Sequence, residues 1–181
     1  SQNLTGIWPK KVVNYKTVMS DAASGFTSVT YPFPVIRMAD LYLMYAEALN
    51  EKGEDYATVL PWIDMVRERS GLQGVKESWD QYVGNSKYAT QTGLRQIIMQ
   101  ERRIELAFEG HYFWDVRRWK TATTELTQPL TGWKVRYGET DVDYYSENLV
   151  LVRDFTPKMY FWPIDIGELR KDPNLVQNYG W

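Results

Sequence analysis

The chain has 181 residues, 44% of them hydrophobic and 24% charged, which is enough for one folded domain with a hydrophobic core. Its formal net charge of -2 provides no basic surface of the kind that holds nucleic acid. Cysteine is absent, which excludes disulfides, thiolate zinc sites and a cysteine nucleophile. No apolar run approaches the roughly 20 residues that a transmembrane helix needs.

Aromatic residues are unusually frequent, at 15% of the chain, with eight Trp and thirteen Tyr. The interior of a domain of this size has few places for so many large rings. We therefore expect several of them to lie in loops, where exposed rings stack on sugars, bases or partner proteins.

The first 34 residues are mixed in character. Residues 10–15 could form a strand, and residues 20–28 are a loop of small residues. Two prolines at positions 32 and 34 predict an extended backbone, because a residue before proline avoids the helical conformation.

Residues 35–71 are predicted to form a helical hairpin. The polar residues of its first helix, about 35–51, form one narrow stripe: Arg37, Asp40, Glu47 and Glu51. We therefore expect this helix to be buried on most sides and to end at Gly53. The second helix has Ile63 and Val66 on its inner face, with Ala57 and Leu60 as further candidates. Pro61 either lies in the first turn of a helix that starts near Thr58 or kinks the helix.

A second hairpin is predicted at residues 93–120, after a linker at residues 72–92. Its first helix runs from about Gly93 to Glu109, and its apolar face consists of Leu94, Ile97, Ile98, Ile104 and Phe108. Gly110 ends that helix, and a short aromatic helix starts at His111. Two such hairpins in series are typical of tetratricopeptide-like arrays.

Residues 121–181 are predicted to be rich in loops, with short strands that partly form β-hairpins. Strand-like segments occur at 132–137, 148–155 and 159–164, separated by turn residues. No linker divides the chain, so we expect one mainly α-helical domain over residues 1–181.

The densest charged stretch lies in the second hairpin. Glu101, Glu105 and Glu109 recur every four residues, hence on one helical face. One interpretation is a carboxylate pair for glycoside hydrolysis or for metal binding. We favour a structural interpretation, in which Arg102, Arg103, Arg117 or Arg118 pairs with these glutamates, because unpaired carboxylates at this spacing would repel one another. The predicted ion-pair core consists of Glu101, Arg102, Arg103, Glu105, Asp115 and Arg118.

Other catalytic or cofactor motifs are not found. His111, the only histidine, has metal-ligand spacing to Asp115, but no second His or Cys completes a site. The sequence contains no P-loop, no dinucleotide-binding glycine motif and no nucleophile elbow. Residues 141–147 resemble a calcium loop only in their first two acids and are interpreted as an acidic turn. We expect no catalytic residue, metal or cofactor.

The candidate ligand-binding residues are aromatic side chains in predicted loops. The principal candidates are Trp79, Tyr82, Tyr144 and Tyr145, and the wider set adds Tyr88, Trp133 and Tyr137. Sugar recognition needs an aromatic surface for the C–H face of the ring and polar groups for the hydroxyls. Polar residues close to these rings in sequence are Asp80, Asn85, Lys87, Asp143 and Asn148. The alternative is that these rings only pack the loops onto the body of the protein.

Four segments resemble one known family. They are PVIRMADLYLMYAEALN at 34–50, IDMVRERSGL at 63–72, ERRIELAFEGHYFWDVRRW at 101–119, and WPI at 162–164 with DPNLVQN at 172–178. In this order they are similar to the motifs of SusD/RagB-type lipoproteins, and the third is the most diagnostic. The resemblance covers essentially all of the chain.

This resemblance implies a helical, tetratricopeptide-like fold and a binding function without enzyme activity. Such proteins are lipoproteins on the surface of the outer membrane of Gram-negative bacteria. They sit on a SusC-like, TonB-dependent transporter and capture glycans for polysaccharide uptake. Family members are longer and carry an N-terminal lipid anchor that is missing from this chain, so the chain resembles their C-terminal portion. The ligand residues of the family lie mostly upstream of this portion.

Two other functions remain open. The chain could be a helical-repeat interaction module, or an accessory for peptide import, that binds no sugar. Less favoured is a glycoside hydrolase that uses Glu101 and Glu105. That enzyme would need an open cleft with two carboxylates roughly 5–10 Å apart and no arginine beside them.

Overall fold

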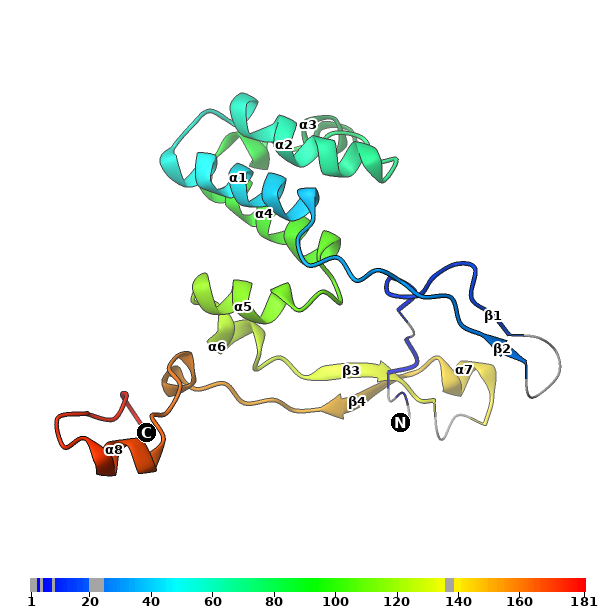
Figure 1. Cartoon of the computed structure of the whole chain (residues 1–181). Coiled ribbons are helices and arrows are strands. Elements are labelled where there is room, and N and C mark those ends of the chain that lie inside the picture. Colours follow the sequence, from blue (N-terminus) through cyan, green and yellow to red (C-terminus); the bar gives the residue numbers. More distant parts are fainter. Residues whose placement is uncertain (1–2, 4, 8, 20–24, 136–138) are drawn as a thin grey trace. The chain divides into compact units, whose positions relative to one another are not determined.

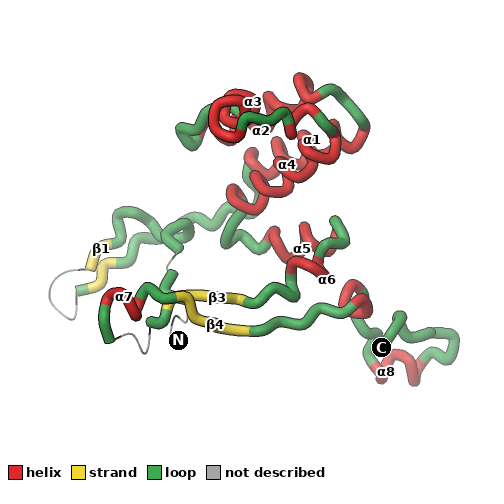
Figure 2. Tube along the Cα trace, turned by 180° about the vertical axis from the view of Figure 1, so that it is seen from behind, coloured by secondary structure: helices red, strands yellow, loops and turns green. Residues whose placement is uncertain are grey.

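The computed structural model describes residues 3, 5–7, 9–19, 25–135 and 139–181. The chain falls into two compact units, one formed by Lys10–Tyr112 and the other by Ser1–Pro9 with Phe113–Trp181. The first is mainly helical and the second combines short helices with a small sheet (Figures 1 and 2). No helix in the described residues is long and apolar enough to cross a membrane.

Three helices form the core of the first unit: α1 (Met38–Lys52), α2 (Tyr56–Arg69) and α4 (Gln91–Glu105). Helix α1 packs against both α2 and α4 (Figure 1). Each helix contributes at least one fully buried aliphatic side chain, namely Leu43, Ile63 and Ile98. The predicted pairing of the first two helices is confirmed, and α4 shares their core.

The turns between these helices use local signals. Gly53 adopts a left-handed conformation with φ 88°, and its N–H bonds to the end of α1, as predicted. Asp55 then caps α2 by accepting a hydrogen bond from the Ala57 N–H at 2.9 Å. Thr90 caps α4 in the same way through the Gly93 N–H at 3.1 Å.

Helix α1 is shorter and more exposed than predicted. It begins at Met38, because Arg37 is still extended, and Val35 and Ile36 before it are exposed. Leu41, Met44 and Tyr45 are also exposed. The expectation of burial on most sides was therefore wrong. The physical reason is that two neighbouring helices cover only part of the circumference of α1.

Helix α2 starts at Tyr56 and not near Thr58, so Pro61 lies inside the helix and not in its first turn, as one of the two alternatives had it. The exposed ring of Pro61 lies on the outer side of the helix. Leu60, Ile63 and Val66 are buried as predicted, whereas Ala57 is exposed.

The predicted linker contains three short helical turns: α3 (Val75–Ser78), the π-helix η1 (Trp79–Val83) and the 3-10 helix η2 (Lys87–Ala89). They are held to the core by Val75 and Tyr88, which are both buried. The Asp64 carboxylate of α2 accepts a hydrogen bond from the Val75 N–H at 2.7 Å and so anchors the first turn.

Helix α4 ends at Glu105, four residues earlier than predicted. Residues 106–110 form turns in which Phe108 and Gly110 have φ of 65° and 84°. Leu94, Ile97 and Ile98 are buried as predicted, but Ile104, in the last turn of the helix, and Phe108, beyond its end, are exposed. The next helix, α5 (His111–Arg118), begins where predicted.

The second unit contains a two-stranded antiparallel sheet of β3 (Leu130–Trp133) and β4 (Glu147–Leu151). Its short helices are α6 (Ala122–Glu125), α7 (Asp141–Tyr144), the 3-10 helix η3 (Pro157–Tyr160) and α8 (Ile166–Lys171). The first two predicted strands overlap β3 and β4. The predicted strand at 159–164 is wrong, because η3 occupies its start and the rest is loop. The predicted acidic turn contains α7.

The remaining strands, β1 (Val18–Met19) and β2 (Phe26–Thr27), pair antiparallel in the first unit. Residues 10–15 form turns, so the strand predicted there was wrong. Most of the loop predicted at residues 20–28 lies outside the described residues.

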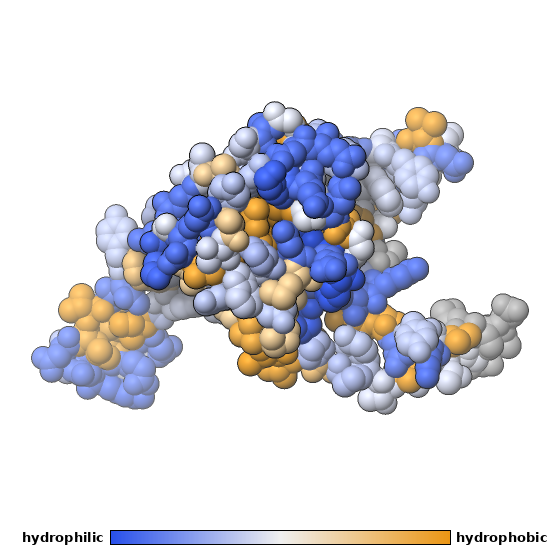
Figure 3. All heavy atoms as spheres, turned by 90° about the horizontal axis from the view of Figure 1, so that it is seen from above, coloured by the Kyte–Doolittle hydropathy of each residue, from blue (hydrophilic) through white to orange (hydrophobic). Residues whose placement is uncertain are grey.

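On the face seen in Figure 3, hydrophobic residues form separate groups with hydrophilic residues between them.

Candidate functional site

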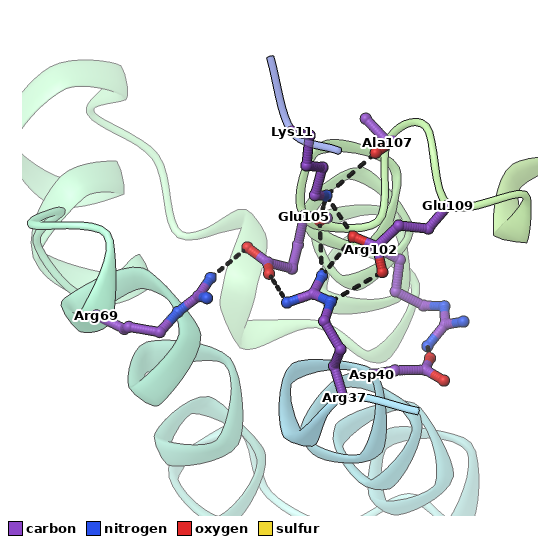
Figure 4. Close-up of polar contacts among 8 residues, drawn as sticks. All are labelled: Lys11, Arg37, Asp40, Arg69, Arg102, Glu105, Ala107 and Glu109. Atoms are coloured by element: carbon purple, nitrogen blue, oxygen red, sulfur yellow. Dashed lines mark hydrogen bonds and ion pairs between the residues drawn. The ribbon is translucent and has the colours of Figure 1, made fainter. Parts of the chain in front are cut away.

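The glutamates of the charged stretch lie in a network of ion pairs (Figure 4). The Arg37 guanidinium donates to both carboxylate oxygens of Glu109, at 2.8 and 2.7 Å, and to Glu105 Oε1 at 2.8 Å. Arg69 donates to the other oxygen of Glu105 at 2.7 Å, and Lys11 pairs with Glu109. The network thus joins the N-terminal segment, α1 and α2 to the end of α4.

Other members of the predicted ion-pair core also have charged or aromatic partners. Glu101 pairs with Arg67 of α2. Arg102, which is 3% exposed, donates to Asp40 of α1 at 2.9 Å. In the second unit, Arg118 donates to Asp115 at 2.8 Å. The Arg103 guanidinium lies 5.1 Å from the centre of the Tyr112 ring.

The cations that contact the three glutamates come mainly from remote positions, namely Lys11, Arg37, Arg67 and Arg69. We expected arginines close in sequence to do so. Spacing along one helix indicates that carboxylates need partners, but it does not identify partners on other helices.

Hydrogen bonds and charges shift two pKa values in this network. The bond to Glu109 raises the pKa of Arg37, which burial alone would lower. Burial would raise the pKa of Glu109, but Arg37 and Lys11 lower it below its ordinary value. Glu109 is therefore ionised at neutral pH. Glu101 and Glu105 each have an arginine against them, so these two residues fail the condition set for a glycosidase site.

The aromatic candidates in residues 72–92, the segment predicted to be a linker, differ in exposure. Trp79 is half-buried against the helical core, and the Lys87 ammonium lies 5.4 Å from the centre of its ring. Tyr82 is 73% exposed. Tyr88 is buried, and its hydroxyl donates to Asp80 at 2.8 Å. Of these three rings, Tyr82 is the most accessible to a ligand.

A pocket of about 460 Å³ lies between the α1–α2 turn and the start of α4. The buried Asn50 side chain donates to the Gln91 carbonyl at 3.1 Å, and Gln91 Nε2 donates to the Asn50 carbonyl at 2.7 Å. Because these amide groups are already engaged in holding α1 to α4, they are poorly placed to bind a ligand.

A second aromatic group lies on the β3–β4 hairpin and consists of Trp133, Tyr144 and Tyr145. We call these three rings the aromatic platform. The centre of the Tyr145 ring is 5.2 Å from that of Trp133 and 5.0 Å from that of Tyr144, both in edge-to-face geometry. Trp133 is 41% exposed and Tyr145 61% exposed. Exposed rings held in fixed relative positions can stack on the apolar face of a sugar.

Backbone contacts position the platform. The Trp133 N–H donates to the Thr5 carbonyl at 3.2 Å, and the Lys134 N–H donates to the Tyr144 carbonyl at 3.0 Å. A Cβ added at Gly132 would lie 2.7 Å from the Thr5 Cα, so glycine allows the N-terminal segment to cross β3. The bond between Lys134 and Tyr144 places the turn before β4 beside the end of β3.

One ion pair lies next to the platform. Lys134 donates to Asp143 at 2.9 Å, and this bond lowers the pKa of Asp143. A charged pair of this kind offers a donor and an acceptor to the hydroxyl groups of a ligand. The sequence prediction included Tyr144 and Tyr145 among the principal candidates and Trp133 only in the wider set. The strand register, which places Trp133 opposite Glu147, brings the three together.

The described residues contain no group of three or more His, Cys, Asp or Glu side chains that could hold a metal ion. His111, at the start of α5, therefore has no partners for a metal site within that part of the chain. Tyr137 of the wider aromatic set lies outside the described residues.

A model of the SusD family matches residues 1–181. The chain belongs to the SusD family. This confirms the resemblance to SusD/RagB-type proteins. The chain is 39% identical to one SusD-like protein of Formosa agariphila and 28% identical to another, over 144 residues each. These alignments cover 80% of the chain but only 23% and 24% of the relatives, so the chain spans about a quarter of their length.

Solved structures of SusD-like proteins have the same fold. A SusD-like protein from Bacteroides fragilis matches with a TM-score of 0.67 and 30% identity, over 85% of this chain and 28% of that one. A SusD-like carbohydrate-binding protein from the same species matches with a TM-score of 0.62 and 32% identity, over 79% of this chain and 28% of that one. The predicted mainly helical, SusD-like fold is confirmed.

Proposed function

We propose that this chain is part of a cell-surface glycan-binding protein without enzyme activity. In this role it captures oligosaccharides and passes them to a SusC-like, TonB-dependent transporter for polysaccharide uptake. It acts at the outer membrane, attached by an N-terminal lipid anchor outside these 181 residues. It needs no cofactor.

The observation that supports glycan binding most directly is the aromatic platform. Two exposed rings in fixed edge-to-face contact lie beside the Lys134–Asp143 pair. This combination of an apolar surface and hydrogen-bonding groups is what sugar recognition requires. Family membership supports it further, because a similar solved SusD-like protein is described as carbohydrate-binding.

The absence of enzyme activity is supported by the charged network. The glutamates that could have acted as a catalytic pair are held by arginines from other helices. Such pairs specify how the helices pack more than they add to stability.

Affinity electrophoresis of the intact chain against a panel of soluble polysaccharides tests the proposal. We expect at least one glycan to retard migration. Trp133→Ala and Tyr145→Ala should each weaken the affinity for that glycan roughly fivefold or more, since one stacked ring contributes about 1–3 kcal/mol. Tyr15→Ala is the matched control, because it removes an exposed tyrosine of the first unit that is not among the ligand-binding candidates.

A third variant separates binding from stability. Arg102→Ala should lower the free energy of unfolding, because it leaves Asp40 buried without this partner, while affinity per folded molecule stays unchanged. If no polysaccharide retards the whole protein of which this chain is a part, the proposal is wrong and an interaction module or a peptide-import accessory is favoured. If only the 181-residue chain fails to be retarded, the aromatic platform is not sufficient for glycan binding.

A further inference from the structure

Three carboxylates lie near the aromatic platform in strand register or along the chain. Glu147 is the strand partner of Trp133, and Asp141 lies in the first turn of α7, three residues before Tyr144. Glu139 precedes that helix. All three are exposed. A polysaccharide that stacks on the platform would therefore lie close to several negative charges.

Among the described residues of the hairpin, no ion pair involves these three carboxylates. Within the described part of the hairpin, the ion pair of Lys134 is with Asp143, which leaves Glu139, Asp141 and Glu147 without an ion-pair partner there. Residues 130–151 contain four acidic and two basic residues in total, so the segment is net negative even when Arg136, outside the described residues, is counted. The hairpin that carries the platform therefore has a net negative charge.

We propose that the aromatic platform selects uncharged glycans and rejects anionic ones, such as those rich in uronate or sulfate groups. This inference rests on the proposed glycan-binding function. The stacked rings recognise the C–H face that neutral and anionic sugars share, so they cannot separate the two classes. Discrimination comes instead from like-charge repulsion by the unpaired carboxylates, an unfavourable interaction that operates only against anionic ligands.

Polysaccharide pairs that share a backbone and differ chiefly in the charge of their substituents test this selectivity. Suitable pairs are hydroxyethyl and carboxymethyl cellulose, native and carboxymethylated laminarin, and methyl-esterified and de-esterified homogalacturonan. For every pair that the intact chain binds, we expect the neutral member to bind roughly tenfold more tightly at about 20 mM ionic strength. The difference should shrink at about 300 mM salt, because exposed charges are then screened within a few ångströms.

Variants identify the carboxylates responsible. Asp141→Asn and Glu147→Gln, alone and combined, should reduce the ratio of neutral to anionic affinity by strengthening binding of the anionic member. Glu168→Gln removes an exposed carboxylate on α8 in the same unit and should leave the ratio unchanged.

Three outcomes are distinguishable. A neutral preference that the hairpin variants reduce supports the inference. Equal or tighter binding of the anionic member, or a ratio that Asp141→Asn and Glu147→Gln leave unchanged, overturns the selectivity but leaves glycan binding intact. Failure to bind any member of any pair or any polysaccharide of the panel overturns the proposed function, and the inference with it.

Discussion

Arg37 shows how a single residue joins several elements of the fold. Its side chain contacts Glu105 and Glu109, and the Glu105 carbonyl accepts a further bond from it at 3.1 Å. Bidentate pairing of a planar guanidinium with a carboxylate fixes both distance and angle. The turn after α4 is thereby attached to the start of α1, although Phe108 in that turn has an unfavourable positive φ.

Glu109 provides a prediction at this scale that depends on pH. Its folded-state pKa is lowered, so it stabilises the fold above the unfolded-state pKa of about 4.3, and this contribution is lost as the pH falls through the folded-state pKa. Glu109→Gln should therefore lower the free energy of unfolding by about 2 kcal/mol at neutral pH, as expected for loss of charge-assisted hydrogen bonds. The difference from wild type should disappear at low pH, where the protonated Glu109 resembles glutamine.

Urea unfolding of wild type and variant between neutral pH and about pH 3 measures this difference. Glu68→Gln, which alters an exposed glutamate of α2, is the control and should show no such trend. A difference that grows on acidification would contradict the assigned pKa direction.

At the level of elements, the start of α4 depends on a tight approach of the chain. Gly93 is buried in the first turn, and a Cβ added there would lie 2.1 Å from the Lys87 carbonyl oxygen and 2.7 Å from Thr90 Oγ1. The backbone of η2 is therefore packed directly against the helix, and any side chain larger than hydrogen must displace it.

Gly93→Ala should destabilise the protein by about 1–3 kcal/mol, because the gain in helix propensity is smaller than the cost of overpacking. Thr92→Ala, at the exposed neighbouring position, is the matched control and should be close to neutral. Thermal denaturation followed by circular dichroism compares the two. Equal melting temperatures for the two variants would show that η2 is not packed against α4 as closely as the structure indicates.

At the level of the whole molecule, the two units differ in how much hydrophobic surface they bury. Twelve residues of the first unit form the core cluster around α1, α2 and α4. The described residues of the second unit contribute Val116, Ala122 and Phe155 to the buried hydrophobic set. Burial of apolar surface is the main favourable contribution to folding, so the first unit should open less often.

Amide hydrogen exchange tests this difference. The amides of Leu43, Ile63 and Ile98 should exchange slowest, and those of Leu149 and Leu151 in β4 should exchange faster by an order of magnitude or more. Comparable protection in β4 and in the core helices would mean that the second unit is stabilised by contacts other than its own buried residues.

Several features follow from the sequence alone. The apolar spacing of Leu94, Ile97 and Ile98 predicts the buried face of α4, and Gly53 predicts the end of α1, because both depend on interactions within a few residues. Family membership was also recognisable, since motifs such as residues 101–119 are contiguous. These are local properties of the chain.

Other features depend on tertiary structure. The partners of Glu105 and Glu109 are separated from them by 36 to 98 positions along the chain, as in Arg69–Glu105 and Lys11–Glu109. The platform forms because the strand register and the N-terminal segment hold Trp133 beside Tyr145. Local spacing can show that a carboxylate needs a cation or that a ring is available for binding. Which remote residue meets it is decided by how the elements pack.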